Sequence, residues 1–202
     1  AIGIDSSRLD VVLMQLVNLM KDGEPVRMSK RTGNAVTLVD LLDEVPIDAA
    51  RFFFNMREPG STIDFDLGLA VKEDSQNPVY YCQYANARIC SILRKMKEEG
   101  IEPRDCTEEE LMLLNAPEER ELIRHLSALT DEIITAAKDY DPARITRYAV
   151  TLATLFHKFY NACRVGVDDE KLRAARLYLC CRVKDVMGII LTEFKITVPE
   201  SM

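Results

Sequence analysis

A short basic loop near the start of the 202-residue chain has the residue types that most directly suggest chemistry. Three cations, Arg27, Lys30 and Arg31, fall within five residues. Gly23 and Gly33 bracket this stretch, so it reads as a hinged segment. A hinged, cationic loop suits the binding of phosphate groups. The same pattern is also typical of a solvated surface turn, so the spacing alone leaves both interpretations open.

A hairpin is predicted to carry this loop. The apolar run at residues 11–17 is rich in β-branched residues, which is typical of a strand buried in a parallel sheet. Asp22-Gly23 is a turn dipeptide, and it predicts that the chain folds back into residues 25–28. The basic loop would then follow directly from the second strand.

Two short helices are predicted after the loop. Thr37 and Asp40 have the spacing of a capping box, with Asp in place of the usual Glu, and this pattern begins a helix at residues 38–42. A second helix is expected to begin at Asp48 and to end at Pro59-Gly60.

From residue 77 onward the pattern is helical almost throughout. Apolar residues recur at helical spacing in four stretches: Tyr81, Ala85, Ile89, Ile92 and Met96; Leu122, Leu126, Leu129 and Ile133; Tyr148, Leu152, Leu155, Phe159 and Cys163; and Leu172, Ala175, Leu179, Val183, Val186 and Ile190. Gly100 is expected to close the first helix, and Asp141-Pro142 to begin the third. The fold class is therefore mainly α: an antiparallel helical bundle over 77–202, preceded by a small α/β part over 1–76.

The composition is that of a folded protein with an acidic surface. Hydrophobic residues make up 48% and charged residues 29%, and the formal net charge is -7. This balance excludes wholesale disorder and argues against sequence-independent coating of DNA, but it leaves room for a local basic face. With no apolar run of membrane-spanning length and no signal peptide, we expect a cytoplasmic protein without a membrane partner. Since the sequence opens without Met, we also expect an excised fragment.

The six cysteines and two histidines match no common zinc pattern. No C-x-x-C pair occurs, and six cysteines in 202 residues are too sparse for a disulfide scaffold. We expect reduced thiols and no protein-bound metal.

Several blocks resemble the arginyl-tRNA synthetase family, whose members are class I aminoacyl-tRNA synthetases. Met28-Ser29-Lys30 resembles the K-M-S-K-S loop of that class. The blocks that resemble the arginyl family itself are Gly23-Glu24-Pro25, Thr32-Gly33-Asn34, Asp64-Phe65-Asp66, the N-P-x-Y-Y-x-Q-Y-A-x-A-R-I stretch at 77–89, the helix at 148–165 and the ending Pro199-Glu200-Ser201-Met202. The resemblance covers nearly the whole chain. It implies the end of a Rossmann-like catalytic domain over 1–76 and a DALR-type anticodon-binding bundle over 77–202.

The resemblance also implies roles for the loop in forming an aminoacyl-adenylate from L-arginine and ATP with Mg²⁺. Lys30 and Ser29 are the implied catalytic residues, and Arg27, Met28, Ser29, Lys30 and Arg31 the implied ATP-binding residues. An ammonium at Lys30 is a compact charge that can follow a moving phosphate. Arg27 stands where the family has its first lysine, so its role is secondary. The H-I-G-H-type motif of this class is missing, and we expect this chain alone to be inactive.

The implied partner of the bundle is an arginine tRNA. Tyr160, Asn161 and Arg164 lie at the end of a predicted helix just before a glycine, and Met202 is expected near the anticodon by resemblance. Unpaired RNA bases stack on aromatic and guanidinium planes, so a few such side chains suffice beside a local basic strip. Each cation also has an ordinary interpretation as solvated charge, and Tyr160 one as a core aromatic.

Other polar residues are predicted to have structural roles or to extend the basic strip. Arg88 and Gln83 are expected to bond across the junction of the two parts, and His157 to be packed or to lie on a helix surface. Further cations at helix-face spacings extend the possible basic strip: Arg144, Arg147, Lys158, Lys171, Arg173 and Arg176. We expect a monomer.

Two other functions remain open. The chain has features that also fit another class I synthetase with a similar helical tail, such as the cysteinyl type, although the block at 77–89 argues against it. A non-enzymatic RNA-binding module that kept the bundle is the second alternative. The intact Met28-Ser29-Lys30 argues against that, because a purely structural turn has no need of a phosphate-seeking lysine.

Overall fold

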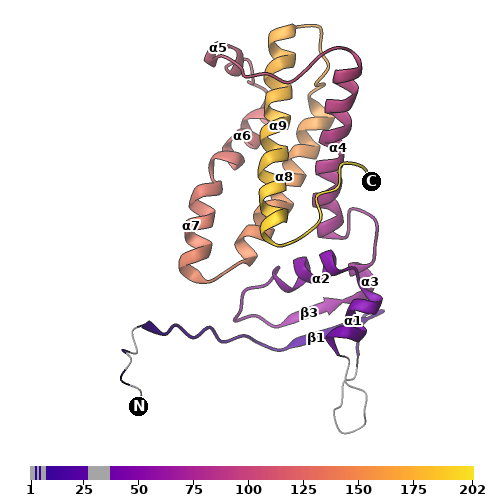
Figure 1. Ribbon diagram of the computed structural model, residues 1–202, viewed down its shortest axis with the longest axis vertical. Helices are drawn as coiled ribbons and strands as arrows, with labels where there is room; N and C mark the ends of the chain where they lie inside the picture. The colour runs from indigo at the N-terminus through magenta and orange to yellow at the C-terminus, as the bar shows by residue number, and fades with distance from the viewer. Residues whose placement is uncertain (1–2, 4, 6–7, 27–36) are drawn as a thin grey trace.

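The computed structural model describes residues 3, 5, 8–26 and 37–202 and has a tall helical bundle standing on a small α/β base (Figure 1). The predicted ATP-binding and catalytic residues lie outside the described residues; they are Arg27, Met28, Ser29, Lys30 and Arg31. The fold class predicted from the sequence, mainly α with a small α/β part, is confirmed.

The base contains a three-stranded sheet in the order β2-β1-β3. Strand β1 (Val17–Lys21) pairs antiparallel with β2 (Glu24–Pro25) and parallel with β3 (Ile63–Asp66), with Val17 opposite Ile63. Asp22 and Gly23 both have positive φ, 54° and 81°, as the two central residues of a type I′ hairpin turn do. The predicted turn and fold-back are therefore confirmed, with β2 at Glu24–Pro25; residues 27 and 28 of the predicted second strand lie outside the described residues.

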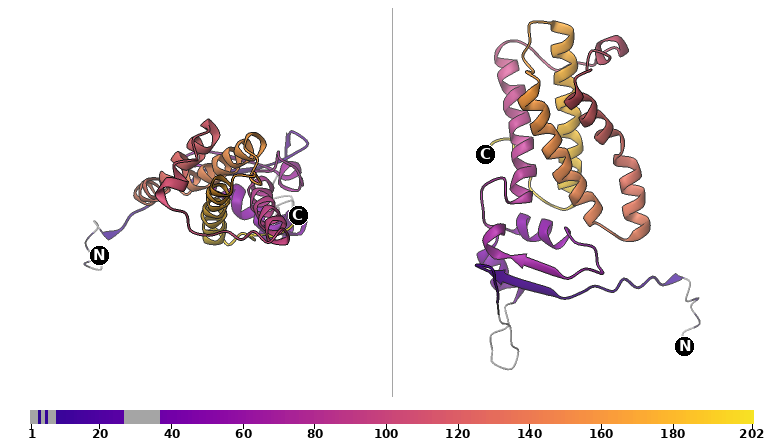
Figure 2. Two further views of the ribbon diagram at one scale, coloured as in Figure 1. Left: turned by 90° about the horizontal axis from the view of Figure 1, so that it is seen from above. Right: turned by 180° about the vertical axis from the view of Figure 1, so that it is seen from behind.

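The predicted position of the first strand is wrong. Residues 11–16 lie outside the sheet, and apolar side chains such as Leu13 and Leu16 are exposed. The ladder with β3 begins only at Val17, so pairing rather than apolar content decides where the strand starts. The segment extends sideways from the base (Figure 2).

Three short helices cover the sheet. Helix α1 (Leu38–Glu44) begins with the predicted capping box, in which Thr37 Oγ1 accepts from the Asp40 N–H. Helix α2 (Ile47–Phe54) begins one residue before the predicted Asp48 and ends five residues before Pro59. Helix α3 (Leu67–Ala70) follows β3 directly. The ring of Phe53 on α2 packs 5.4 Å from that of Phe65 on β3, which holds α2 against the sheet.

The bundle runs up and down along the long axis of the molecule (Figure 1). Its elements are α4 (Pro78–Glu98), α5 (Glu108–Leu111), α6 (Pro117–Ser127), α7 (Leu129–Asp139), α8 (Ala143–Ala162) and α9 (Glu170–Glu193). Helices α4 and α8 run one way and α9 the other, so the bundle is antiparallel, as predicted. Gly100, with φ 75°, follows the C-cap of α4 in the predicted place. Asp141-Pro142 directly precedes α8, whose N-cap is Pro142, and the side chain of Asp141 accepts from the Ala143 N–H.

One predicted helix is split in two. The sequence pattern predicts one continuous helix from Leu122 to Ile133. In the structure the helix is interrupted at Ala128, between α6 and α7. The reason is that the carbonyl of His125 accepts from the Ala128 N–H at 3.2 Å and from the Tyr148 hydroxyl at 2.9 Å. In a continuous helix the His125 carbonyl would instead accept from the N–H four residues later, and these two bonds replace that one.

The core is continuous from the sheet into the bundle, with Phe65, Phe52 and Phe156 all buried in one cluster. Asn77 links the two parts: it caps α4 and donates to the carbonyls of Ala70 and Lys72. The division into separate domains at 76/77 stays a prediction. Among the described residues, no helix is both long and apolar enough to cross a membrane.

Candidate nucleic-acid interface

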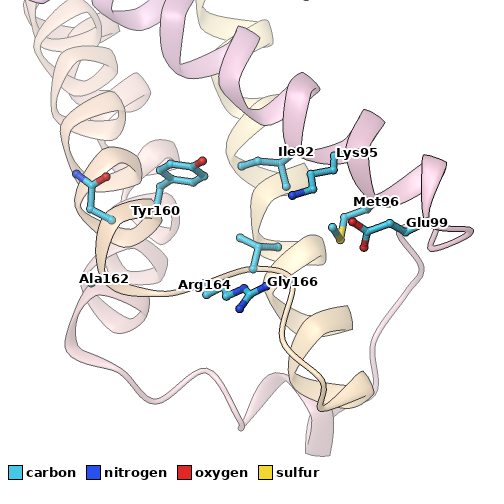
Figure 3. Close-up of a pocket in the computed structure, with 10 residues that line it drawn as sticks. Ile92, Lys95, Met96, Glu99, Tyr160, Ala162, Arg164 and Gly166 are labelled. Carbon is cyan, nitrogen blue, oxygen red and sulfur yellow. The ribbon is translucent and has the colours of Figure 1, made fainter.

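A groove of about 550 Å³ opens between the C-terminal half of α4 and the turn that follows α8. Tyr160 and Asn161 line it from the end of α8, and Arg164 from the turn. Figure 3 shows Lys95 and Glu99 on the facing side of α4, with the Tyr160 ring directed across the groove. Three of the predicted RNA-binding residues therefore line one groove.

A second hollow of about 400 Å³ adjoins the first. It shares Tyr160 and Lys95 with the groove, and it adds Tyr84 and Arg88 from α4 and Met202 from the C-terminal tail. Met202 is 52% exposed. All four predicted RNA-binding residues thus lie along one continuous surface, although they are up to 42 positions apart in the sequence. We call the two hollows together the α4–α8 groove.

Arg88 contacts two tyrosine rings. Its guanidinium carbon is 4.7 Å from the centre of the Tyr84 ring and 4.8 Å from that of Tyr160, and it donates a hydrogen bond to the Tyr84 hydroxyl. Such contacts hold a guanidinium plane in place without removing its charge. The prediction that Arg88 bonds across the junction is wrong as far as the described residues go, because its contacts there are with Tyr84 and Tyr160 of the bundle.

Sequence reasoning missed Tyr84 and Arg88 as groove residues. Their spacing of four places them on one face of α4, which was a usable signal. Their neighbour Tyr160 comes from α8, and only the packing of α4 against α8 brings the three together. Tyr160 is 38% exposed, so it is not the core aromatic that the alternative interpretation required. Gln83, in contrast, bonds to Asp48 of α2, as predicted.

His157 is packed beneath this surface, one helical turn from Tyr160. It is 9% exposed, and its ring lies 4.8 Å from that of Tyr81 and 5.7 Å from that of Tyr84. Burial, with a smaller contribution from the positive charge of Arg88, lowers the pKa of His157 to about 4. The imidazole is therefore neutral near pH 7, and His157 acts as a packing residue.

A buried ion pair fixes the turn that carries Arg164. The guanidinium of Arg176 on α9 donates to the Glu119 carboxylate at 2.7 Å and to the backbone carbonyl of Arg164 at 2.7 Å. Glu119 is fully buried, and its other oxygen accepts from the Ala116 N–H at 2.8 Å. The Arg164 backbone is thus tied to two helices, while its side chain is exposed.

Several cations of the expected basic strip form hydrogen bonds or ion pairs within the protein. Arg176 is paired as above, and Arg173 donates to the carbonyl of Val167. Arg144 pairs with Glu132 and Arg147 with Asp141, around a separate hollow near His125. Within the described part of the chain, the groove cations Lys95 and Arg164 form no ion pair with a carboxylate.

The groove offers what an unpaired nucleic-acid loop needs. The half-exposed ring of Tyr160 presents a plane for base stacking. Lys95 and Arg164, which form no ion pair among the described residues, lie beside it for the phosphates. A single-stranded loop can use such a local surface even on a protein whose net charge is -7.

Comparison with known proteins defines the class. Residues 82–202 match the family model described as the DALR anticodon binding domain, and the chain belongs to this family. The chain is also 52% identical over 202 residues to the arginine–tRNA ligase of Caldanaerobacter subterraneus, and 50% identical to that of Acetivibrio thermocellus. Each match covers the whole of this chain and 36% of the relative, so the chain spans about a third of their length.

Solved structures agree. A putative arginyl-tRNA synthetase from Campylobacter jejuni superposes with a TM-score of 0.81 and 30% identity, over 99% of this chain and 42% of that one. The arginyl-tRNA synthetase of Thermus thermophilus gives 0.75 and 25%, over 94% of this chain and 35% of that one. The resemblance to arginyl-tRNA synthetases is confirmed.

Proposed function

We propose that this chain is the tRNA-binding part of an arginine–tRNA ligase and holds the anticodon loop of arginine tRNA in the α4–α8 groove. The observation that carries this proposal is the contact of Arg88 with the rings of Tyr84 and Tyr160 on a surface that also presents Lys95 and Arg164. Membership of the DALR family supports the choice of an anticodon loop over another unpaired RNA.

The whole enzyme would attach L-arginine to its tRNA at the expense of ATP, with Mg²⁺ accompanying the nucleotide. In that reaction a carboxylate attacks the α-phosphorus of ATP and pyrophosphate leaves, so positioning and charge neutralisation do most of the catalytic work. We assign Lys30 and Ser29 to the departing phosphates, with Arg27, Met28 and Arg31 in the same ATP loop. This assignment rests on the sequence motif. We expect the chain alone to be inactive and monomeric.

A titration of the purified 202-residue chain tests the proposal. Arginine tRNA and a tRNA for another amino acid are each added to labelled chain at one fixed salt concentration, since electrostatic RNA binding depends strongly on salt. The proposal expects binding of arginine tRNA at least tenfold tighter than that of the other tRNA. Equal affinities for the two tRNAs would contradict the proposal and favour a non-enzymatic RNA-binding module or a purely structural bundle.

The alternative of a cysteinyl-type tail has its own test. Cysteine tRNA serves as the second RNA in the same titration, so a preference for it over arginine tRNA would favour that alternative. The relatives named above, all of the arginine type, support the arginyl assignment.

A further inference from the structure

The C-terminal tail, residues 195–202, runs back from the end of α9 across α2 and along α4 (Figures 1 and 2). It leaves α9 through a Schellman motif, in which Lys195 has a left-handed φ of 57° and the Ile196 N–H donates to the Leu191 carbonyl at 2.8 Å. Ile196 is buried, which anchors the start of the tail.

Helix α2 and Gln83 hold the tail at its first contacts. The Thr197 N–H donates to the Asp48 carboxylate at 3.1 Å, and Arg51 donates to the carbonyl of Lys195. The Gln83 amide donates to the same Asp48 oxygen at 3.1 Å and to the Thr197 carbonyl at 3.0 Å. Asp48, Gln83 and the Thr197 backbone therefore form one closed set of hydrogen bonds between α2, α4 and the tail.

Helix α4 holds the tail further along. The amide of Asn86, a buried residue, donates to the Pro199 carbonyl at 2.8 Å, and Arg94 donates to the Glu200 carbonyl at 3.3 Å. Each of these bonds, like those at Lys195 and Thr197, is made to a backbone atom of the tail. They fix which residue lies at each position along α4, whatever the tail side chains are.

We propose that Asp48, Gln83 and Asn86 are positioning residues that hold the tail in a single register, so that Glu200, Ser201 and Met202 form a fixed wall of the tRNA-binding groove. The length of the tail, more than its side chains, then determines the shape of that wall. This inference rests on the proposed function and adds to it the residues that shape the binding surface. It also links the groove to α2, in the α/β base.

The experiment compares variants of the 202-residue chain that release or shift the tail. Asp48→Ala removes the acceptor shared by Gln83 and Thr197, whereas Asp48→Asn keeps an acceptor oxygen and serves as the rescue. Asp43→Ala, an exposed change of the same charge on α1, is the matched control. Inserting one glycine between residues 200 and 201 shifts Met202 while leaving the tail's hydrogen bonds to α2 and α4 in place. The control is the insertion of one glycine after Glu102, an exposed residue of the loop between α4 and α5.

Two quantities are measured for each variant: hydrogen exchange over 195–202, and the ratio of affinities for arginine tRNA and for the same tRNA with a substituted anticodon. Asp48→Ala should speed exchange in the tail at least tenfold and reduce the affinity ratio at least fivefold, with the melting temperature of the bundle and exchange in α9 kept. Asp48→Asn, Asp43→Ala and the insertion after Glu102 should leave both quantities unchanged, and the insertion between residues 200 and 201 should reduce the affinity ratio alone.

Unchanged tail exchange in Asp48→Ala, or an unchanged affinity ratio after the insertion between residues 200 and 201, overturns the inference. Should the unmodified chain itself show no anticodon preference, the proposed function fails. The exchange data would then still decide whether Asp48 holds the tail.

Discussion

The guanidinium carbon of Arg88 lies 4.8 Å from the centre of the Tyr160 ring, which joins α4 to the exposed end of α8. Tyr84 also contacts Arg88, at 4.7 Å from its ring centre, so the three side chains hold one another in place. Side chains that are held in place lose little entropy when a base stacks on them, which favours tight binding.

Truncation of Tyr160 should therefore weaken RNA binding. Base–aromatic stacking contributes about 1–3 kcal/mol, so Tyr160→Ala should weaken binding of arginine tRNA on the order of tenfold or more, and Tyr160→Phe much less. Fluorescence titration of the labelled chain measures both. Tyr178→Ala is the matched control, because Tyr178 stacks on Arg182 in the same way at 5.0 Å but lines a different hollow. A similar loss for Tyr178→Ala would show that the effect is not local to the groove.

Removal of Arg176 should destabilise the bundle. The change Arg176→Ala leaves the fully buried carboxylate of Glu119 without its charge partner, and such a change costs about 3–5 kcal/mol. Urea denaturation followed by circular dichroism measures the free energy of unfolding. Arg182→Ala, which breaks an exposed pair with Asp185, should cost at most about 1 kcal/mol. Equal costs for the two variants would contradict the structural role given to the Glu119–Arg176 pair.

Acidification should destabilise the protein through His157. Its pKa is about 4 in the folded chain against 6.5 for a free side chain, so between these values the unfolded state binds more protons. The free energy of unfolding should fall as the pH drops from about 6.5 to about 4, by up to about 3 kcal/mol from this residue.

Urea denaturation at several pH values measures this dependence on pH. His157→Gln removes the titrating group and should flatten the curve in that window. An equally steep curve in the variant would place the pH dependence elsewhere.

Substitution of Lys30 should separate catalysis from tRNA binding. In the complete ligase, Lys30→Ala should slow adenylate formation on the order of 100-fold or more, since a preorganised donor to developing charge typically contributes that much. Affinity for tRNA should change little. Pyrophosphate exchange and tRNA titration measure the two effects, and equal losses in both would contradict the assignment of Lys30 to the departing phosphates.

Local signals in the sequence predicted the elements that depend on neighbouring residues. The capping box at Thr37, the Asp22-Gly23 turn and the helical faces through Ile89 and Leu152 are all set by contacts a few positions apart, and each is found as predicted.

Features that depend on distant partners could not be predicted in this way. The apolar run before Val17 lies outside the sheet because β3 pairs from Val17 onward, and α6 ends because Tyr148 bonds the His125 carbonyl. For the candidate site, Tyr160 and Arg164 were predictable as exposed residues near a helix end. The contact between Arg88 and Tyr160 was not predictable, because it depends on the packing of α4 against α8.

The proposed function requires that the α4–α8 groove reads the anticodon of arginine tRNA. Its most direct test is a titration of the 202-residue chain with arginine tRNA and with the same tRNA carrying a substituted anticodon, using unmodified chain and Arg88→Ala. We predict that the anticodon change weakens binding to the unmodified chain at least tenfold, and that Arg88→Ala removes most of this difference. Identical affinities of the unmodified chain for both RNAs would contradict the claim.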